Sequence, residues 1–337
     1  MLRLGGWSRP AVCLAVERGY SKLVDLLCSK NCSTSIQDRE GMSPLHLAAV
    51  YGYTEVAAIL LDNRADINYR KAGQGDTALH MAAANKKVYM VAFLLSRGAK
   101  VDVPNCDGKT PLMYAAAKGD LESARLLMAA GANPLVTDKG GNTALLLHTA
   151  SAWLSKEMTR LLSAEGRAVN LCNGNGSYPI LEVVKSTFSE KQDALQVLIK
   201  AGADLDVINR LGSSPLHLVC SNSDWTSARI LVRGGARLDI MDSLGRTPMF
   251  IVLKTENLLL AGAMLAAGCG INLTEEQHAQ LGTAAKLFVK EQRRPVSLKY
   301  SARRVLRRAW GRQIDTQLDR VHIPTQLKHY VYYLLEY

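Results

Sequence analysis

The 337-residue sequence is poor in aromatic residues, which make up 6% of the chain, and it lacks a long apolar run. The uncharged stretch 257–272 falls short of the roughly 20 apolar residues that a membrane-spanning helix needs. A shorter apolar run, 11–16, is followed at once by Glu17 and Arg18, which is not the pattern of a signal peptide. We therefore expect no membrane partner and a protein of the cytoplasm, with the nucleus as an alternative compartment.

The chain has too few cysteines for a disulfide-rich protein. The seven cysteines are odd in number, and none belongs to a Cys-x-x-Cys pair. Zinc fingers and thioredoxin-like sites use such pairs, and small secreted domains use even sets of cysteines. The sequence therefore predicts neither a metal site of this kind nor a disulfide framework.

Common catalytic motifs are missing as well. The chain has no Gly-x-x-x-x-Gly-Lys-Ser/Thr phosphate loop, no Gly-x-Ser-x-Gly elbow and no His-Glu-x-x-His helix. His148, His278, His322 and His329 have no Cys or His partner at metal-ligand spacing. We expect a protein without catalytic activity, cofactor or bound metal.

Acidic residues are outnumbered, 30 against 41 basic ones, which gives a net charge of +11. The excess is uneven, because residues 291–337 hold ten Lys or Arg and four Asp or Glu, a net of +6. A nucleic-acid-binding domain usually carries its positive charge over one face or stripe. The charge here belongs mostly to the tail, so we expect no nucleic-acid partner.

What the sequence does contain is an internal repeat, the feature that decides its fold. Glycines recur at intervals of 33 to 36 residues, at Gly41, Gly75, Gly108, Gly141, Gly176, Gly212 and Gly245.

A helix-start signal follows most of these glycines. It reads Ser-Pro-Leu-His at 43–46 and 214–217, Thr-Ala-Leu-His at 77–80, and Thr-Pro at 110–111 and 247–248. Ser or Thr accepts a hydrogen bond from an unpaired N–H of the first turn. Proline at the next position costs no hydrogen bond, because the N–H that it lacks would have no partner in the helix. The pattern predicts a short first helix, then a leucine-rich second helix that ends at a glycine.

This pattern resembles the ankyrin repeat over about residues 11–273. The resemblance implies an all-α solenoid of about eight helix-turn-helix repeats with hairpin loops, since a single unit cannot bury its apolar face alone. It also implies that His46, His80 and His217 tie neighbouring loops together rather than bind a metal. Ankyrin repeats bind other proteins through their hairpin tips and concave groove, so an unidentified protein partner is expected.

Large or basic side chains near the turns are the candidate contacts for that partner. Aromatic residues often anchor interfaces, although packing between repeats or solvated turns would use the same residues. The candidates are Tyr51, Tyr114, Trp153, Trp225, Arg70 and Lys71.

The tail contains a basic amphipathic segment, 297–310. Its apolar residues Leu298, Ala302, Val305 and Leu306 are spaced to lie on one helix face, and Ser297 suits the N-cap. The segment resembles the first helix of a SOCS box, whose elongin-binding motif is Ser/Thr-Leu-x-x-x-Cys-x-x-x-aliphatic. Ser297, Leu298 and Leu306 match the motif, and Ala302 stands where the family has Cys.

Downstream, the SOCS box has a Leu-Pro-aliphatic-Pro element and a Leu-x-x-Tyr-Leu helix. Ile323, Pro324, Leu327 and Tyr330 match these elements, whereas 321–322 reads Val-His in place of Leu-Pro. The order of the two motifs behind an ankyrin stack identifies the chain as similar to the ankyrin repeat and SOCS box family.

That resemblance implies a substrate-recognition subunit of an elongin–cullin–RING ubiquitin ligase, with the repeats holding the protein to be ubiquitinated. The box would be a small three-helix domain that binds elongin B and elongin C, and the Ile323-Pro324 element would contact the cullin, usually the fifth paralogue, which brings the RING subunit. The implied elongin contacts are Ser297, Leu298, Ala302, Val305 and Leu306.

The predicted domain boundaries follow from these motifs. Residues 1–40 form a degenerate N-terminal repeat, 41–273 seven repeats, 274–295 a linker or capping helix, and 296–337 the SOCS box.

Two other functions fit the same sequence. One is an ankyrin scaffold or inhibitor without a ligase, whose C-terminal helix only caps the stack. The other is a basic tail helix that binds calmodulin, an import receptor or an anionic surface. The salt dependence of binding distinguishes the basic-tail function from elongin binding. Contacts between charges weaken with added salt, whereas an apolar Leu298 anchor does not.

Overall fold

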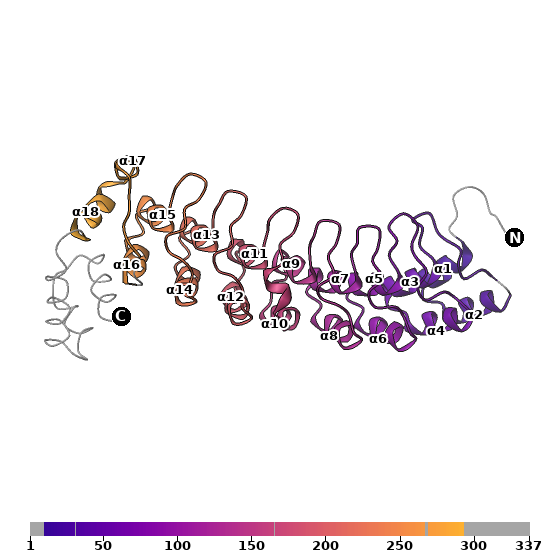
Figure 1. The fold of residues 1–337 in the computed structure, drawn as a ribbon. Helices are drawn as coiled ribbons and strands as arrows, with labels where there is room; N and C mark the ends of the chain where they lie inside the picture. The colour runs from indigo at the N-terminus through magenta and orange to yellow at the C-terminus, as the bar shows by residue number, and fades with distance from the viewer. Residues whose placement is uncertain (1–9, 31, 165, 267–268, 293–337) are drawn as a thin grey trace. The chain divides into compact units, whose positions relative to one another are not determined.

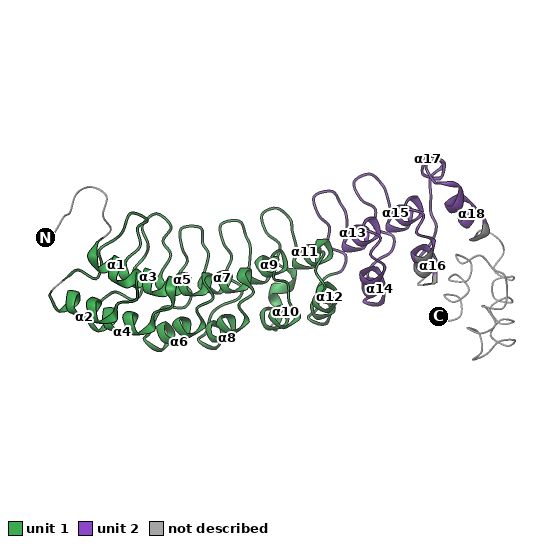
Figure 2. Ribbon diagram, turned by 180° about the vertical axis from the view of Figure 1, so that it is seen from behind, with its two compact units in different colours: residues 1–204 green, residues 205–337 purple. Residues whose placement is uncertain are grey.

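The structure, a computed structural model, describes residues 10–30, 32–164, 166–266 and 269–292. These residues form helices joined by turns and loops, with no strand among them (Figure 1). The chain divides into two compact units, 1–204 and 205–337 (Figure 2). The all-helical fold is thus confirmed for this part of the chain. The predicted SOCS box and its Ser297, Leu298, Ala302, Val305, Leu306, Ile323 and Pro324 lie outside the described residues.

The first unit consists of successive helix pairs. Its helices are α1 (Ala11–Glu17), α2 (Ser21–Ser29), α3 (Pro44–Tyr51), α4 (Thr54–Asp62), α5 (Ala78–Ala84), α6 (Val88–Ser96), α7 (Pro111–Lys118), α8 (Leu121–Ala129), α9 (Ala144–Thr149), α10 (Lys156–Ser163), the 3₁₀ turn η1 (Arg167–Asn170), α11 (Pro179–Lys185) and α12 (Lys191–Lys200).

The second unit continues the same alternation and then changes. Its helices are α13 (Pro215–Ser221), α14 (Trp225–Arg233), α15 (Pro248–Lys254), α16 (Leu258–Ala266), α17 (Glu275–Ala279) and α18 (Thr283–Gln292).

The first helix of each pair begins where the sequence predicts. Ser43 and Ser214 are N-caps in extended conformation, and each side chain accepts a hydrogen bond from the N–H three residues on. Thr247 caps α15 in the same way, and proline follows all three caps. These caps satisfy N–H groups that a helix start otherwise leaves unpaired.

Small side chains let the first helices stack closely. Ala48 and Ala49 of α3 are fully buried, as are Ala82 and Ala83 of α5 and their counterparts in α7. Neighbouring first helices contact each other throughout the unit. The core is therefore a continuous layer of alanine, leucine and valine shared between neighbouring pairs, as expected of a repeat protein.

In several helix pairs the turn between the two helices contains a residue in left-handed conformation. Gly52 and Gly119 supply it, with φ of +84° and +66°. At Lys86, Ser223 and Glu256 the same turn is made by a non-glycine residue with φ of 53° to 55°, a conformation that costs free energy for a residue with a Cβ.

The segment after the last pair is helical but not wholly polar. The sequence predicts one or two polar helical turns over 275–292, and the structure has α17 and α18 there. Thr274 caps α17 with a capping box completed by Gln277. Ala285 and Val289 of α18 are buried, so one apolar face of this helix is shielded from solvent.

Candidate protein-interaction surfaces

Most hairpins are closed by one polar side chain three residues before the turn glycine; the hairpin of Gly75 has Ala72 there. In the third hairpin, Asn105 Oδ1 accepts hydrogen bonds from the N–H groups of Asp107 and Lys109, both at 2.9 Å. Such a side chain replaces a missing backbone acceptor and fixes the turn. The same role is filled by Asp38, Asp138, Asn173, Asn209 and Asp242.

Neighbouring hairpins are also bonded directly to each other through the backbone. Cys106 N–H donates to Gln74 O, and Lys139 N–H donates to Asp107 O, each at 2.8 Å. A Cβ on Gly108, which has φ of +80°, would lie 3.1 Å from Lys139 N. Glycine thus permits a close approach that makes the tips of the first unit a fixed row rather than independent loops.

The recurring histidines add side-chain hydrogen bonds between neighbouring hairpins in both units. Nδ1 of His46, His80 and His217 accepts a hydrogen bond from the N-cap N–H at 3.0 to 3.1 Å. The opposite ring nitrogen, Nε2, therefore carries the proton and donates to a backbone oxygen of the next hairpin at 2.9 to 3.0 Å. Burial lowers the pKa of all three imidazoles. Their predicted role in tying loops together is confirmed.

His148 is a fourth buried histidine, which sequence reasoning left without a role. Its Nδ1 lies 3.3 Å from Ala116 O in α7, and its Nε2 lies 3.2 Å from both N and O of Ser155. It joins α9 to the preceding helix pair and to the start of α10, and burial lowers its pKa. In the sequence, only the apolar residues around His148 could have indicated that its ring is buried.

Two of the predicted partner contacts are exposed at helix turns of the first unit. The Tyr51 ring stacks on that of Tyr53, with centroids 5.7 Å apart. Trp153 is 56% exposed, and Lys86 Nζ lies 4.1 Å from the centre of its ring. A Cβ on Gly119 would lie only 2.5 Å from Trp153 Cβ, so the glycine makes room for this side chain.

The other predicted contacts have structural partners. Arg70 Nη2 donates to Pro104 O at 2.8 Å, and Lys71 Nζ donates to Gln74 Oε1 at 2.9 Å. Tyr114 lies within α7 rather than at its end, and its hydroxyl accepts from Asn105 Nδ2 at 3.2 Å. Burial, together with the nearby Asp76 carboxylate, raises the pKa of Tyr114 to about 12. Trp225, in the second unit, begins α14 and is half-buried.

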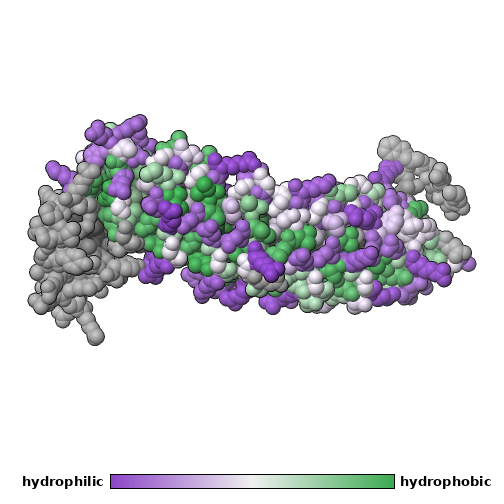
Figure 3. Space-filling view, viewed as in Figure 1, coloured by the Kyte–Doolittle hydropathy of each residue, from purple (hydrophilic) through white to green (hydrophobic). Residues whose placement is uncertain are grey.

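Sequence reasoning missed an apolar surface on the hairpins of the second unit. Ile208, Leu211, Met241 and Leu244 are between 52% and 72% exposed. The two hairpins are joined by a hydrogen bond of 3.0 Å from Ser243 N to Leu211 O. Hydrophobic surface is visible over this unit as green areas in Figure 3.

The missed signal was a leucine directly before the turn glycine in two successive repeats, Leu211 and Leu244. The first unit has Glu40 and Asp107 at the corresponding position. Four large apolar side chains gathered in this way form the kind of patch that marks interaction sites.

Within the described ranges, no three His, Cys, Asp or Glu side chains are grouped as a metal site would require. None of the helices in the same ranges is long and apolar enough to cross a membrane.

Comparisons with known proteins identify the repeat. The family model described as ankyrin repeats in three copies matches residues 4–71 and 65–138. The mouse nuclear factor NF-kappa-B p105 subunit is 32% identical over 137 residues, which is 40% of this chain and 14% of that protein. The chain therefore contains ankyrin repeats, and no SOCS box domain is found.

One relative combines the two predicted parts in its name. The human ankyrin repeat and SOCS box protein 16 is 31% identical over 185 residues, 53% of this chain and 40% of that protein. A Caenorhabditis elegans homologue of transient receptor potential cation channel subfamily A member 1 is 29% identical over 157 residues, 47% of this chain and 13% of that protein. The chain thus spans less than half the length of these relatives.

Proposed function

We propose that this ankyrin-repeat chain is the substrate-recognition subunit of an elongin–cullin–RING ubiquitin ligase. The observation that carries the proposal is the order of motifs at 297–306 and 323–330 behind the repeats. The similarity to the human ankyrin repeat and SOCS box protein 16 supports it. The repeats supply a non-catalytic binding surface, and ubiquitin transfer belongs to the other subunits.

The elongin-binding segment is centred on Leu298. Its side chain enters an apolar pocket of elongin C, with Leu306 and Val305 on the same helix face and Ser297 at the N-cap. Ala302 keeps the family's cysteine position small and apolar, and the lost area weakens the contact by about 1 kcal/mol. Elongin binding therefore survives this departure.

The cullin contact falls on Ile323 and Pro324. Val321 and His322 replace a Leu-Pro pair, so the turn before this element is less rigid than in the family pattern. We expect weaker cullin recruitment than elongin binding.

The substrate protein would contact the exposed side chains described above. In the first unit these are Tyr51 and Trp153, with Arg70 and Lys71 at a hairpin. In the second unit they are the apolar hairpin residues Leu211 and Leu244. Exposed aromatic and apolar groups on a rigid backbone lose little entropy on binding, which favours them as anchors.

The test is capture of recombinant elongin B–elongin C by the full chain and by Leu298→Asp. An aspartate in an apolar pocket loses its hydration without compensation, so the variant should bind no elongin. Leu244→Asp is the matched control, because Leu244 is exposed on a hairpin and its change should leave elongin binding intact. Circular dichroism melting establishes that both variants keep their helices.

A scaffold without ligase activity is the second candidate, and one observation favours it. Leu281, Ala285 and Val289 after the last helix pair are buried, as a helix that only caps a repeat stack would require. The scaffold predicts folded wild-type protein that captures no elongin.

A further inference from the structure

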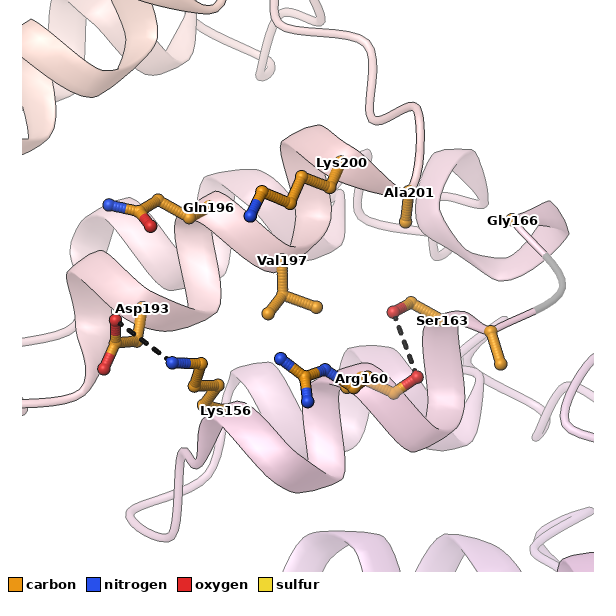
Figure 4. A pocket seen from close by; sticks show the side chains of 10 residues that line it. Lys156, Arg160, Ser163, Gly166, Asp193, Gln196, Val197, Lys200 and Ala201 are labelled. Atoms are coloured by element: carbon orange, nitrogen blue, oxygen red, sulfur yellow. Dashed lines mark hydrogen bonds and ion pairs between the residues drawn. The ribbon is translucent and has the colours of Figure 1, made fainter.

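A groove lies between α10 and α12, the second helices of two neighbouring pairs in the first unit (Figure 4). It encloses a cavity of about 510 Å³. Its walls include small side chains, Ser163, Val197 and Ala201, together with Gly166. These short groups leave the space between the two helices open.

Local sequence explains why the groove occurs at this pair. α10 ends at Ser163, whereas α4, α6 and α8 each run for nine residues. The chain then passes through Gly166, at φ of +69°, into η1. α10 is thus one residue shorter than these helices, and the turn at Gly166 borders the groove at its end.

Positive charge lines this groove. Figure 4 shows the charged ends of Lys156, Arg160 and Lys200 around the space between the helices. Within the described ranges, Asp193 is the one acidic residue that lines the cavity, and its Oδ1 lies 3.7 Å from Lys156 Nζ. Among the described residues, Arg160 and Lys200 have no ion-pair partner.

In the neighbouring repeat, the arginine equivalent to Arg160 has an ion-pair partner. Arg125 stands in α8 where Arg160 stands in α10, five residues after the N-cap. Arg125 Nε lies 3.8 Å from Glu122 Oε1 on the same helix. Within the described part of the chain, Arg160 forms no such pair with Glu157, the equivalent acid.

We propose that this groove binds a phosphoserine side chain of a partner protein. One exposed ion pair in water contributes little, but several cations around one slot favour a group with more than one negative charge. The planar Arg160 guanidinium matches the oxygen pairs of phosphate and carboxylate, and the lysines add point charges. The inference does not depend on the ligase role.

Four labelled Gly-Ser peptides of equal length test this by fluorescence anisotropy with the full chain. The first carries a phosphoserine between two glutamates, and the second carries serine between the same glutamates. The third carries phosphoserine between glutamines, and the fourth serine between glutamines. The third peptide should bind more tightly than the second, because phosphoserine concentrates its negative charge on one group.

We expect the first peptide to bind at least about tenfold more tightly than the neutral fourth, since a charge-assisted hydrogen bond of about 1.5 kcal/mol corresponds to that ratio. Arg160→Ala and Lys200→Ala should each weaken binding several-fold, and added salt should weaken it further. Arg125→Ala, the matched control at the same helix position, should not.

Two results would overturn the proposal. One is equal binding of the charged and neutral peptides by the wild-type chain. The other is an equal loss of binding in Arg125→Ala and Arg160→Ala, which would assign the effect to net charge rather than to the groove. Thermal melting of each variant shows that a loss of binding is not a loss of fold.

Discussion

At the scale of single residues, the stack depends on buried polar side chains with complete hydrogen bonds. His46 is the clearest example, because both ring nitrogens are bonded and the ring is 1% exposed. A buried donor or acceptor left without a partner costs about 1–3 kcal/mol, so the neutral, correctly protonated ring is part of the fold. This arrangement has a consequence for the pH dependence of stability.

Stability should fall as the pH is lowered through the histidine range. Burial lowers the pKa of His46, His80, His148 and His217 in the folded chain, while in the unfolded chain each titrates near 6.5. The stabilisation is fully present above about pH 6.5 and is lost as the pH falls from there through the lowered folded values. Urea unfolding at pH 7.5, 6.5 and 5.5 measures this change.

Each of these histidines contributes at most about 1.4 kcal/mol per pH unit to the slope. His148→Gln removes one of them and should make the slope shallower. A free energy of unfolding that stays constant between pH 7.5 and 5.5 would show that the buried rings are not held neutral.

Gly119 is the second residue whose role can be measured directly. Gly119→Ala should lower the free energy of unfolding by about 2–4 kcal/mol, since it adds overlap with Trp153 to the cost of a left-handed alanine. Gly131→Ala is the matched control: Gly131 has φ of +90° and nothing within 4 Å of an added Cβ. It should cost only about 1–2 kcal/mol. Equal losses in urea unfolding would mean that Trp153 is not packed over Gly119.

At the scale of elements, a left-handed turn recurs in several helix pairs and is made by different residues along this chain. Gly52 and Gly119 adopt it without a Cβ, whereas Lys86, Ser223 and Glu256 adopt it against their own preference. The latter positions therefore offer room for stabilisation.

Ser223→Gly should raise the free energy of unfolding by about 0.5 kcal/mol. Relief of the left-handed conformation, worth about 1–2 kcal/mol, exceeds the entropy that glycine adds to the unfolded chain. Ser221→Gly, two residues earlier at the end of α13, is the control and should destabilise, because Ser221 donates to His217 O. The shift in thermal midpoint distinguishes them, and a lower midpoint for Ser223→Gly would contradict the argument.

The sequence predicts the starts of several helices but not the surfaces that form between repeats. The Ser-Pro and Thr-Pro signals predict the starts of α3, α7, α13 and α15, because an N-cap residue and a proline in the first turn act locally. The groove beside α10 was not predictable, since it depends on how Ser163 and Val197 of different repeats face each other. The exposure of Leu211 and Leu244 was missed for a related reason: a leucine beside a turn reads as core until its neighbours are placed.

For the predicted site residues as well, exposure could be predicted from the sequence but packing against other repeats could not. Trp153 is exposed as a contact residue should be, but its packing over Gly119 depends on a glycine one repeat earlier. Tyr114 was placed near a helix end by its spacing, and the structure shows its hydroxyl bonded to Asn105 instead. Whether these residues bind a partner stays a prediction, as does the role of the tail.

At the scale of the whole molecule, the account divides the work between the repeats and the tail. We propose that the repeats hold the substrate and that the motifs at 297–306 and 323–330 bind elongin and cullin. A receptor of this kind acts by raising the local concentration of target lysines near the conjugating enzyme, so it needs no catalytic group. Elongin binding is the step on which the rest depends.

The most direct test is titration calorimetry of elongin B–elongin C into the purified full chain. The account predicts saturable binding of one adaptor per chain that persists in high salt, because an apolar anchor is insensitive to ionic screening. Leu298→Asp should give no heat of binding while keeping the wild-type melting curve. No binding by folded wild-type protein, or undiminished binding by Leu298→Asp, would contradict the account.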